Sequence, residues 1–138
     1  MRPHWAFHYL GRPYAVGTAG PETYDCWGLV RAVMATRGAI DLPEVGVSEG
    51  DIRALISAFE AHPERARWRE VTDGSATELD AVLMATARRP IHVGLWVDVA
   101  MGRVLHAARP LGVVAQSRVQ LAASGYRIVA RFRHAGLG

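Results

Sequence analysis

The architecture is decided by one stretch of sequence, Cys26-Trp27-Gly28-Leu29-Val30-Arg31-Ala32-Val33-Met34. Counted from Cys26, its apolar side chains stand at i+3, i+4, i+7 and i+8, the spacing of an amphipathic helix that buries one face. A loop rich in Gly and Pro precedes the stretch at residues 11–21, and Gly38 predicts where the helix ends. Cys26 is therefore expected in the first helical turn, on the inward face.

The thiol at this place supports three interpretations. Cys26 is the only cysteine, so it cannot close a disulfide within the chain. In a first helical turn, unpaired backbone N–H groups and the helix dipole favour a thiolate, which suits a nucleophile. An inward-facing cysteine on a helix is more commonly a small core residue, and a metal ligand is the third interpretation. A nucleophile needs a base, so the histidines have to be considered next.

A candidate base lies in a strand predicted from Ile91 to Val97. Alternation places the apolar side chains of this strand on one face, which leaves His92 on the other. A second predicted strand, from Arg103 to Ala107, carries His106, and residues 98–102 between the two strands are predicted to form the turn of a hairpin.

The length of the hairpin turn determines whether the two histidines meet. An odd-length turn centred on Val99 pairs His92 with His106, and one centred on Ala100 pairs His106 with Gly94. Either register puts both histidines on one face, with about 4.5–5.5 Å between Cβ atoms that are directly opposite. A turn of even length would separate them. We also expect Gly94 to leave room for the start of a helix to approach the pair.

Two histidines on one face can serve as base and orienter for a thiol. Cys26, His92 and His106 would then form a triad with a histidine in the third role. The spacing alone is equally compatible with two unconnected, half-exposed histidines. A zinc site made of the same three residues is a further alternative, although the chain lacks the paired close ligand spacings usual for zinc. The remaining histidines are expected at the solvated surface: His4, His8, His62 and His134.

The order of the predicted elements gives the fold class. After the Cys26 helix, a second helix is predicted from Ser48, with its buried stripe ending at Phe59, and His62-Pro63 stops it. Strands follow, predicted at Leu79–Met84, Ile91–Val97, Arg103–Ala107, around Val113 and Val114, and at Tyr126–Phe132. This order predicts an α+β domain with helices on a small curved antiparallel sheet or open barrel. Residues 1–138, half of them apolar, fit a single domain.

Charge and hydropathy narrow the range of partners. The net charge of +3 comes from arginines spread along the chain, without the aromatic-interleaved basic stripe that favours nucleic acid, so no nucleic-acid partner is expected. Residues 1–10 contain no apolar run long enough for a signal peptide, and no later run approaches membrane-spanning length. We therefore expect synthesis in the cytoplasm without a signal peptide, and no membrane insertion.

At these residues the chain resembles the NlpC/p60 family of cell-wall cysteine peptidases. The similarity covers most of the chain, and its motifs, each short, are specific in their order and spacing. The opening loop of the family resembles Tyr9-Leu10-Gly11-Arg12-Pro13-Tyr14, and its nucleophile motif resembles Tyr24-Asp25-Cys26-Trp27-Gly28-Leu29-Val30. The strand that leads into the base strand resembles Leu79-Asp80-Ala81-Val82-Leu83-Met84, and the base strand resembles His92-Val93-Gly94-Leu95-Trp96-Val97. The strand of the third polar residue resembles Val104-Leu105-His106-Ala107.

The resemblance implies a papain-like fold with permuted strand order, in which N-terminal helices pack on a small antiparallel barrel-like sheet. It implies hydrolysis of the bond between γ-D-glutamate and diaminopimelate in peptidoglycan, without cofactor or metal. In that reaction Cys26 is the nucleophile, His92 the base and His106 the orienter. Tyr14 matches the family tyrosine that binds substrate or the developing oxyanion, for which the Cys26 N–H is a further donor. Asp25 matches a position near the substrate and equally fits a helix cap.

Trp27 departs from the family pattern, in which a serine usually follows the nucleophile. This variant resembles the subgroup found in bacteriophage tails and gene transfer agents, where the indole would stand beside the thiol and shape the substrate groove. It implies an enzyme of the tail tip, with tail proteins as partners and the target cell's periplasm as the place of action. One rival is a structural tail-tip module with an unused peptidase-like site. Another is a lipid acyltransferase of the related permuted fold, in which the histidine precedes the cysteine.

Overall fold

The computed structural model describes residues 3–44, 60–87 and 92–137. Within these ranges the helices are α1 (Cys26–Arg37) and α3 (Arg118–Ala123), and short 3-10 helices are η1 (Trp5–His8), η2 (Pro63–Arg67) and η3 (Ala135–Leu137). The strands are β1 (Trp68–Glu70), β2 (Ala81–Ala85), β3 (His92–Val97), β4 (Arg103–Ala108), β5 (Gly112–Gln116) and β6 (Arg127–His134). The stripe of the helix predicted from Ser48 to Phe59 lies outside the described residues.

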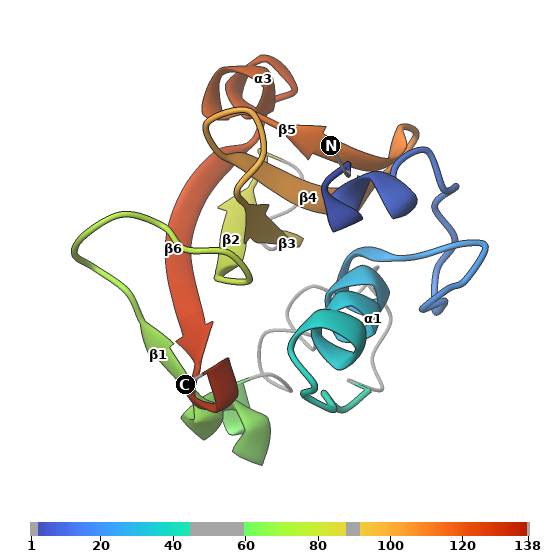
Figure 1. Ribbon diagram of the computed structural model, residues 1–138. Helices are drawn as coiled ribbons and strands as arrows, with labels where there is room; N and C mark the ends of the chain where they lie inside the picture. The colour runs from blue at the N-terminus through green and yellow to red at the C-terminus, as the bar shows by residue number, and fades with distance from the viewer. Residues whose placement is uncertain (1–2, 45–59, 88–91, 138) are drawn as a thin grey trace.

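The strands form one antiparallel sheet of six in the order β1-β6-β2-β3-β4-β5. The three middle connections β2-β3, β3-β4 and β4-β5 join neighbours in both sequence and space, whereas β6 returns to insert between β1 and β2. In Figure 1, α1 lies on one side of this sheet and α3 lies beyond β5. The predicted α+β class is confirmed.

Five of the six strands match predicted segments to within two residues at each end, and the one that was missed is β1. It has three residues, and such a short edge strand carries no measurable periodicity. Helix α3, which lies between two predicted strands, was also missed, because its six residues make less than two helical turns. The sequence does contain a signal for this helix, a capping box. The Ser117 side chain accepts from the Gln120 N–H, and the Gln120 side chain accepts from the Ser117 N–H.

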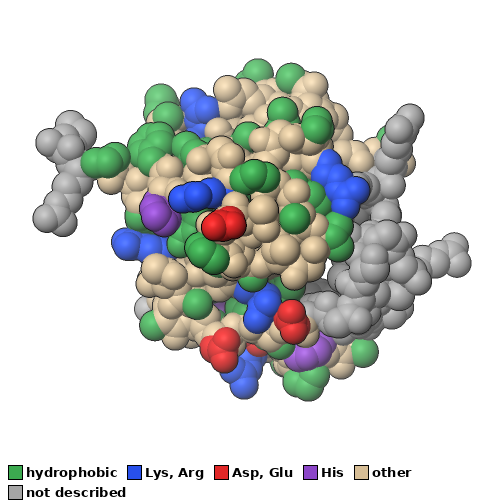
Figure 2. Space-filling view, turned by 90° about the vertical axis from the view of Figure 1, so that its right-hand side faces the viewer, with side chains coloured by type: hydrophobic (Ala, Val, Ile, Leu, Met, Phe, Trp, Pro, Cys, Tyr) green, Lys and Arg blue, Asp and Glu red, His purple; other side chains and the backbone are tan. Residues whose placement is uncertain are grey.

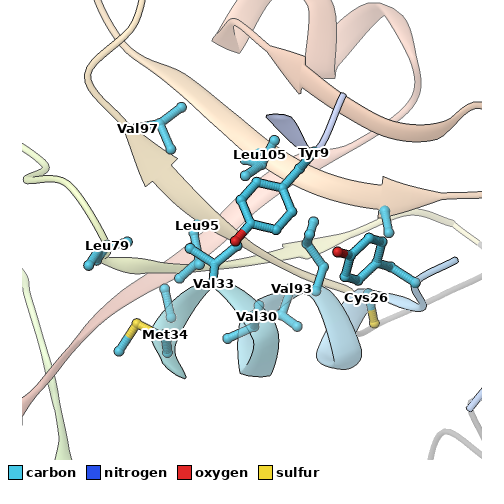
Figure 3. Close-up of a cluster of buried hydrophobic side chains, with 14 of the residues drawn as sticks. Tyr9, Cys26, Val30, Val33, Met34, Leu79, Val93, Leu95, Val97 and Leu105 are labelled. Carbon is cyan, nitrogen blue, oxygen red and sulfur yellow. The ribbon is translucent and has the colours of Figure 1, made fainter. Parts of the chain in front are cut away.

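Helix α1 forms as predicted and packs against β3 and β4. Val30, Val33 and Met34 are fully buried and face a sheet surface that includes Leu95 and Leu105 (Figure 3). Each such side chain contributes about 1.5–3 kcal/mol when it leaves water, so this contact fixes the helix on the sheet. The position of this contact also determines where α1 starts relative to β3.

The opposite face of the sheet has its own, smaller apolar cluster. Leu121 of α3 packs with Val82, Met84 and Val104, whose neighbours in each strand point to the α1 side. Tyr126 lies at the border of this cluster. Both faces of the central strands are therefore covered, and a polar residue on either face is removed from water.

The surface carries no dominant charge on the face that Figure 2 shows, where arginines and carboxylates are interspersed among apolar and neutral side chains. This agrees with the dispersion of arginine along the sequence. None of the described helices has the length and apolar character needed to cross a membrane.

Candidate active site

Cys26 is the first residue of α1 and is 6% exposed. It belongs to the same buried cluster as Val93, and Figure 3 shows the Cys26 end of α1 on the Val93 side and Met34 on the Leu79 side. The helix therefore begins near the start of β3, whose first residue is His92. The predicted position of the thiol, in the first turn and on the inward face, is confirmed.

Asp25 caps this helix. One carboxylate oxygen accepts the Gly28 N–H at 2.6 Å, and the other accepts the Gly17 N–H at 2.7 Å. A side chain at position 28 would collide with the Thr18 carbonyl, 1.9 Å from the place of a Cβ, so glycine lets the opening loop lie against the first turn. Capping of α1 occupies one oxygen of Asp25 and the contact with the opening loop occupies the other, so the carboxylate positions the segment that carries the thiol.

The β3–β4 hairpin has the register of a turn centred on Ala100, with Leu95 opposite Leu105 and Val97 opposite Arg103. His92 and His106 consequently share one face, and His92 Nε2 lies 2.8 Å from His106 Nδ1. The placement of both histidines on one face is confirmed, and the alternative of two unconnected histidines is wrong. Both side chains are buried, at 2% and 0% exposure, because the second apolar cluster covers their face.

Gly94 serves the pair differently from our expectation. A Cβ at this position would stand 2.7 Å from the Leu105 carbonyl oxygen and 2.9 Å from the His106 Cβ. The space beside Gly94 is thus filled by β4, and the expectation that a helix start would occupy it was wrong. The glycine permits close approach of the two strands, which brings the imidazoles within hydrogen-bonding distance.

The pair continues into a chain of hydrogen bonds. His106 Nε2 lies 2.7 Å from Gln116 Oε1, and Gln116 Nε2 donates to Ser124 Oγ at 3.1 Å. An amide oxygen only accepts, so His106 carries its proton on Nε2 and its Nδ1 accepts from His92 Nε2. Neutral His92 then has its lone pair on Nδ1, the nitrogen that can take a proton from a thiol.

Burial lowers the pKa of His106 below its ordinary value of 6.5, and the hydrogen bond to Gln116 opposes this only in part. A fully buried imidazole with neutral partners disfavours the charged form, because nothing replaces the water that would solvate the cation. His106 therefore stays neutral at pH 7. A neutral His106 is the acceptor that holds the proton of His92 on Nε2.

Tyr126 completes the pair and was missed as a site residue. Its ring stacks on His92 with centroids 5.0 Å apart and planes 27° from parallel, and it meets His106 edge-on at 5.3 Å. The sequence places Tyr126 at the start of a strand, but contact across β6 and β3 depends on sheet order, which no local pattern encodes. Gln116 and Ser124 were missed for the same reason.

A model of the NlpC/P60 family matches residues 11–133, from the opening loop through α1 and the histidine strands into β6. The chain belongs to the NlpC/P60 family. This is a family of cysteine-peptidase cell-wall hydrolases. A comparison with curated proteins found no match.

Solved structures share the papain-like fold of this NlpC/P60 chain. The NlpC/p60 domain of the peptidoglycan hydrolase SagA has a TM-score of 0.57 at 21% identity, covering 93% of this chain and 92% of that domain. NlpC1 and NlpC2 from Trichomonas vaginalis have TM-scores of 0.63 and 0.62 at 21% and 19% identity, each covering 94% of this chain. This chain spans 41% and 43% of the length of those two proteins.

Tyr14 of the NlpC/P60 opening loop is tied to the segment that leads to the thiol. The Tyr24 N–H donates to the Pro13 carbonyl at 3.1 Å, and the Ala15 N–H donates to the Tyr24 carbonyl at 3.1 Å. The Tyr14 hydroxyl is buried and has no hydrogen-bond partner in the described part of the chain. The role that the resemblance implies for this hydroxyl stays a prediction.

Trp27 extends from the first turn of α1 toward the segment that follows the helix. Its indole N–H donates to the Pro43 carbonyl at 2.9 Å, and the half-buried ring packs on the main apolar cluster. The ring therefore anchors the chain after α1.

The other histidines correct one expectation. His134 is 5% exposed and its Nε2 lies 3.0 Å from Glu64 Oε1, itself a buried side chain, so its predicted place at the surface was wrong. His8 is exposed, and His62 caps η2 as a half-buried residue. No group of three His, Cys, Asp or Glu side chains suited to a metal occurs among the residues that the structure describes.

Proposed function

We propose that this chain is a cysteine peptidase that hydrolyses peptidoglycan stem peptides, at the bond between γ-D-glutamate and diaminopimelate. The observation that carries the proposal is the His92–His106 hydrogen bond at 2.8 Å, whose proton positions leave His92 Nδ1 basic. Cys26 starts the helix that packs on β3, and His92 starts that strand. Membership of the NlpC/P60 family supports the choice of substrate class.

In the proposed reaction, His92 Nδ1 takes the thiol proton and the Cys26 sulfur attacks the γ-carbonyl carbon. The backbone N–H of Cys26 and the hydroxyl of Tyr14 donate to the oxyanion that forms. The C–N bond breaks as His92 returns the proton to the departing amine, which leaves a thioester. Water, deprotonated by His92, then releases the acid and restores the thiol.

Purified peptidoglycan and a synthetic stem peptide test this reaction, with mass spectrometry of the fragments. The expected products are a new amine on diaminopimelate and a new γ-carboxylate on glutamate. Cys26→Ser is the matched control, because it changes one atom and keeps the fold. Intact substrate after incubation with the wild-type chain would contradict the proposal.

The coupling of thiol and base has its own test in alkylation by iodoacetamide. A thiolate paired with an imidazolium reacts near neutral pH, whereas an ordinary thiol with a pKa near about 8.5 reacts mainly above pH 8. We expect rapid labelling of Cys26 at pH 7 in the wild type and a profile shifted to higher pH in His92→Ala. Identical pH profiles of labelling in the two proteins would show that His92 does not activate the Cys26 thiol.

We further propose that the enzyme is a component of a phage-like or gene-transfer-agent tail, held at the tip by tail proteins and active in the target cell's periplasm. The support is Trp27 after the nucleophile, the variant that resembles tail-associated members. Particles that carry Cys26→Ser should contain the protein in low copy number, assemble normally and deliver DNA poorly. Unimpaired delivery would favour a structural tail-tip module, and failed assembly would show a building role.

A further inference from the structure

A groove of about 510 Å³ lies between the opening loop and the turn that joins β4 to β5. Tyr14 lines one wall and Arg109 the other, and the remaining lining residues are uncharged. The Arg109 guanidinium carbon lies 4.9 Å from the centre of the Tyr14 ring. Stacking of this kind leaves the N–H edge of a guanidinium open to a planar acceptor.

Both walls of the groove lead to the candidate active site. The loop wall is bonded to Tyr24, two residues before Cys26. The other wall continues β4, and extension of the observed β3–β4 register places Ala108, the residue before Arg109, opposite His92. A peptide held at Cys26 would therefore extend into this groove.

The groove has an unbalanced positive charge. In the described part of the chain Arg109 has no carboxylate partner and no hydrogen-bond acceptor, and its contact is with the Tyr14 ring. A guanidinium held in this way favours an anionic, planar ligand group. A stem peptide carries such groups, because its glutamate is linked through the γ-carboxyl and keeps a free α-carboxylate.

We propose that Arg109 binds a free carboxylate of the stem peptide beside the scissile bond, so that the enzyme distinguishes acidic from amidated stems. The proposal rests on the proposed function for the identity of the peptide. A charge-assisted, bidentate contact predicts about 10- to 100-fold weaker binding of a stem peptide whose contacted carboxylate is amidated.

The test measures binding of three peptides to Cys26→Ala protein by calorimetry: the free acid, the glutamate α-amide and a diaminopimelate carboxamide. One amide should bind more weakly, which identifies the carboxylate. Arg109→Gln should bind the free acid as weakly as that amide, and Arg109→Lys should retain part of the preference. Arg69→Gln, with the same loss of charge on the far edge strand β1, is the matched control and should keep wild-type preference.

The two hypotheses fail differently in this experiment. Preference for the free acid that survives Arg109→Gln, or equal affinity for all three peptides, would overturn the carboxylate subsite. Arg109-dependent preference without cleavage of any peptide by the wild-type chain would support the subsite and contradict the peptidase activity. Equal loss of affinity for acid and amide in Arg109→Gln would show that the arginine acts only as a wall of the groove.

A second inference rests on the hydrogen bonds behind the histidines. We infer that Gln116 is a positioning residue that decides which nitrogen of His92 is basic. In the structure its Nε2 lies 3.1 Å from Ser124 Oγ and its Oε1 lies 2.7 Å from His106 Nε2, the orientation in which Oε1 accepts from His106. The reverse orientation would put protons on His106 Nδ1 and on His92 Nδ1, and that nitrogen could not accept a proton.

Nitrogen-15 NMR of the imidazoles at pH 7.5 tests this without reference to activity. The measurement uses Cys26→Ala protein, in which no thiol can give a proton to His92. We expect a proton on Nε2 of both His92 and His106 there, whereas a further Gln116→Glu change should favour a charged His106 with both ring nitrogens protonated. Gln116→Leu in the same Cys26→Ala protein should show mixed tautomers, and Gln116→Leu alone should lower kcat about 10- to 100-fold with little change in KM. Unchanged tautomers after Gln116→Leu, or protonated Nδ1 nitrogens in Cys26→Ala protein, would overturn the inference.

Discussion

Two buried histidines at opposite ends of the sheet have partners of opposite kinds. His106 lies between the His92 ring and the Gln116 amide, whereas His134 faces the carboxylate of Glu64 and meets the Trp68 ring edge-on. Each is 5% exposed or less. Burial alone therefore does not define a catalytic histidine.

The difference lies in what the partners do with a proton. The Glu64 carboxylate accepts from His134 Nε2, and the Gly136 N–H donates to His134 Nδ1 at 2.9 Å, which secures η2 to β6 and leaves no free lone pair for proton transfer. No carboxylate faces His106, so its ring stays uncharged. Its unprotonated Nδ1 accepts from His92, which fixes the proton of His92 on Nε2. The catalytic role of His92 therefore depends on the chain of hydrogen-bond acceptors behind it.

The largest effect is expected from the base itself. His92→Ala should lower kcat at least about 10⁴-fold, because no other group in the described site can take the thiol proton. His134→Ala is the matched control and should leave turnover per folded molecule unchanged while lowering stability. Stem-peptide cleavage measured at equal concentrations of folded protein distinguishes them. Comparable losses of kcat in the two variants would remove the distinction between the histidines.

The orienter should be partly replaceable. His106→Ala is expected to lower kcat about 10²- to 10³-fold, and His106→Asn should be milder, since an amide oxygen can still accept from His92 Nε2. Turnover of both variants with the same peptide gives the ranking. Complete and equal loss in both, together with stoichiometric zinc by metal analysis, would restore the metal-ligand interpretation.

The structural pair should affect stability alone. Glu64→Ala leaves the buried His134 Nε2–H without its acceptor and should lower the free energy of unfolding by about 1–3 kcal/mol. Urea denaturation followed by fluorescence measures the loss. Arg69→Ala on exposed β1 is the control and should change it by less than about 0.5 kcal/mol. A fall in kcat of the folded Glu64→Ala protein would contradict the purely structural role.

The lowered pKa of His106 predicts a pH dependence of stability. Between the folded pKa and the ordinary value of 6.5, the unfolded chain binds a proton that the folded chain excludes. Stability should therefore fall as the pH drops below about 6.5. His106→Asn should lose this part of the slope. Urea midpoints at pH 7.5, 6.5 and 5.5 for both proteins provide the comparison, and parallel curves would contradict the assignment.

The smallest effect is expected from the stacked ring. Tyr126→Leu removes the aromatic ring that stacks on His92. The His92 imidazole would then be less well oriented but still present, so we expect kcat to fall several-fold. Tyr126→Phe keeps the ring and separates stacking from the hydroxyl group. A kcat for Tyr126→Leu equal to that of the wild type would show that the hairpin alone holds His92.

The sequence by itself determined the parts that depend on local periodicity. The spacing of apolar residues after Cys26 fixed α1 and put the thiol in its first turn, because a helix repeats every 3.6 residues whatever surrounds it. Alternation along β3 and β4 put each histidine on a defined face of its own strand, but the sequence left open the parity of the turn, and the observed register decided that the two histidines share a face. The order of short motifs also indicated the family, which the match over residues 11–133 established.

Only the tertiary structure decided which distant residues complete the site. Gln116, Tyr126 and Arg109 are brought to it by strand order, by the return of β6 beside β2 and by the turn after β4. It also showed that Gly94 accommodates β4 and that His134 is buried against Glu64. The physical reason is range: periodicity reports which face a residue takes, whereas its partner across the sheet depends on the packing free energy of the whole chain.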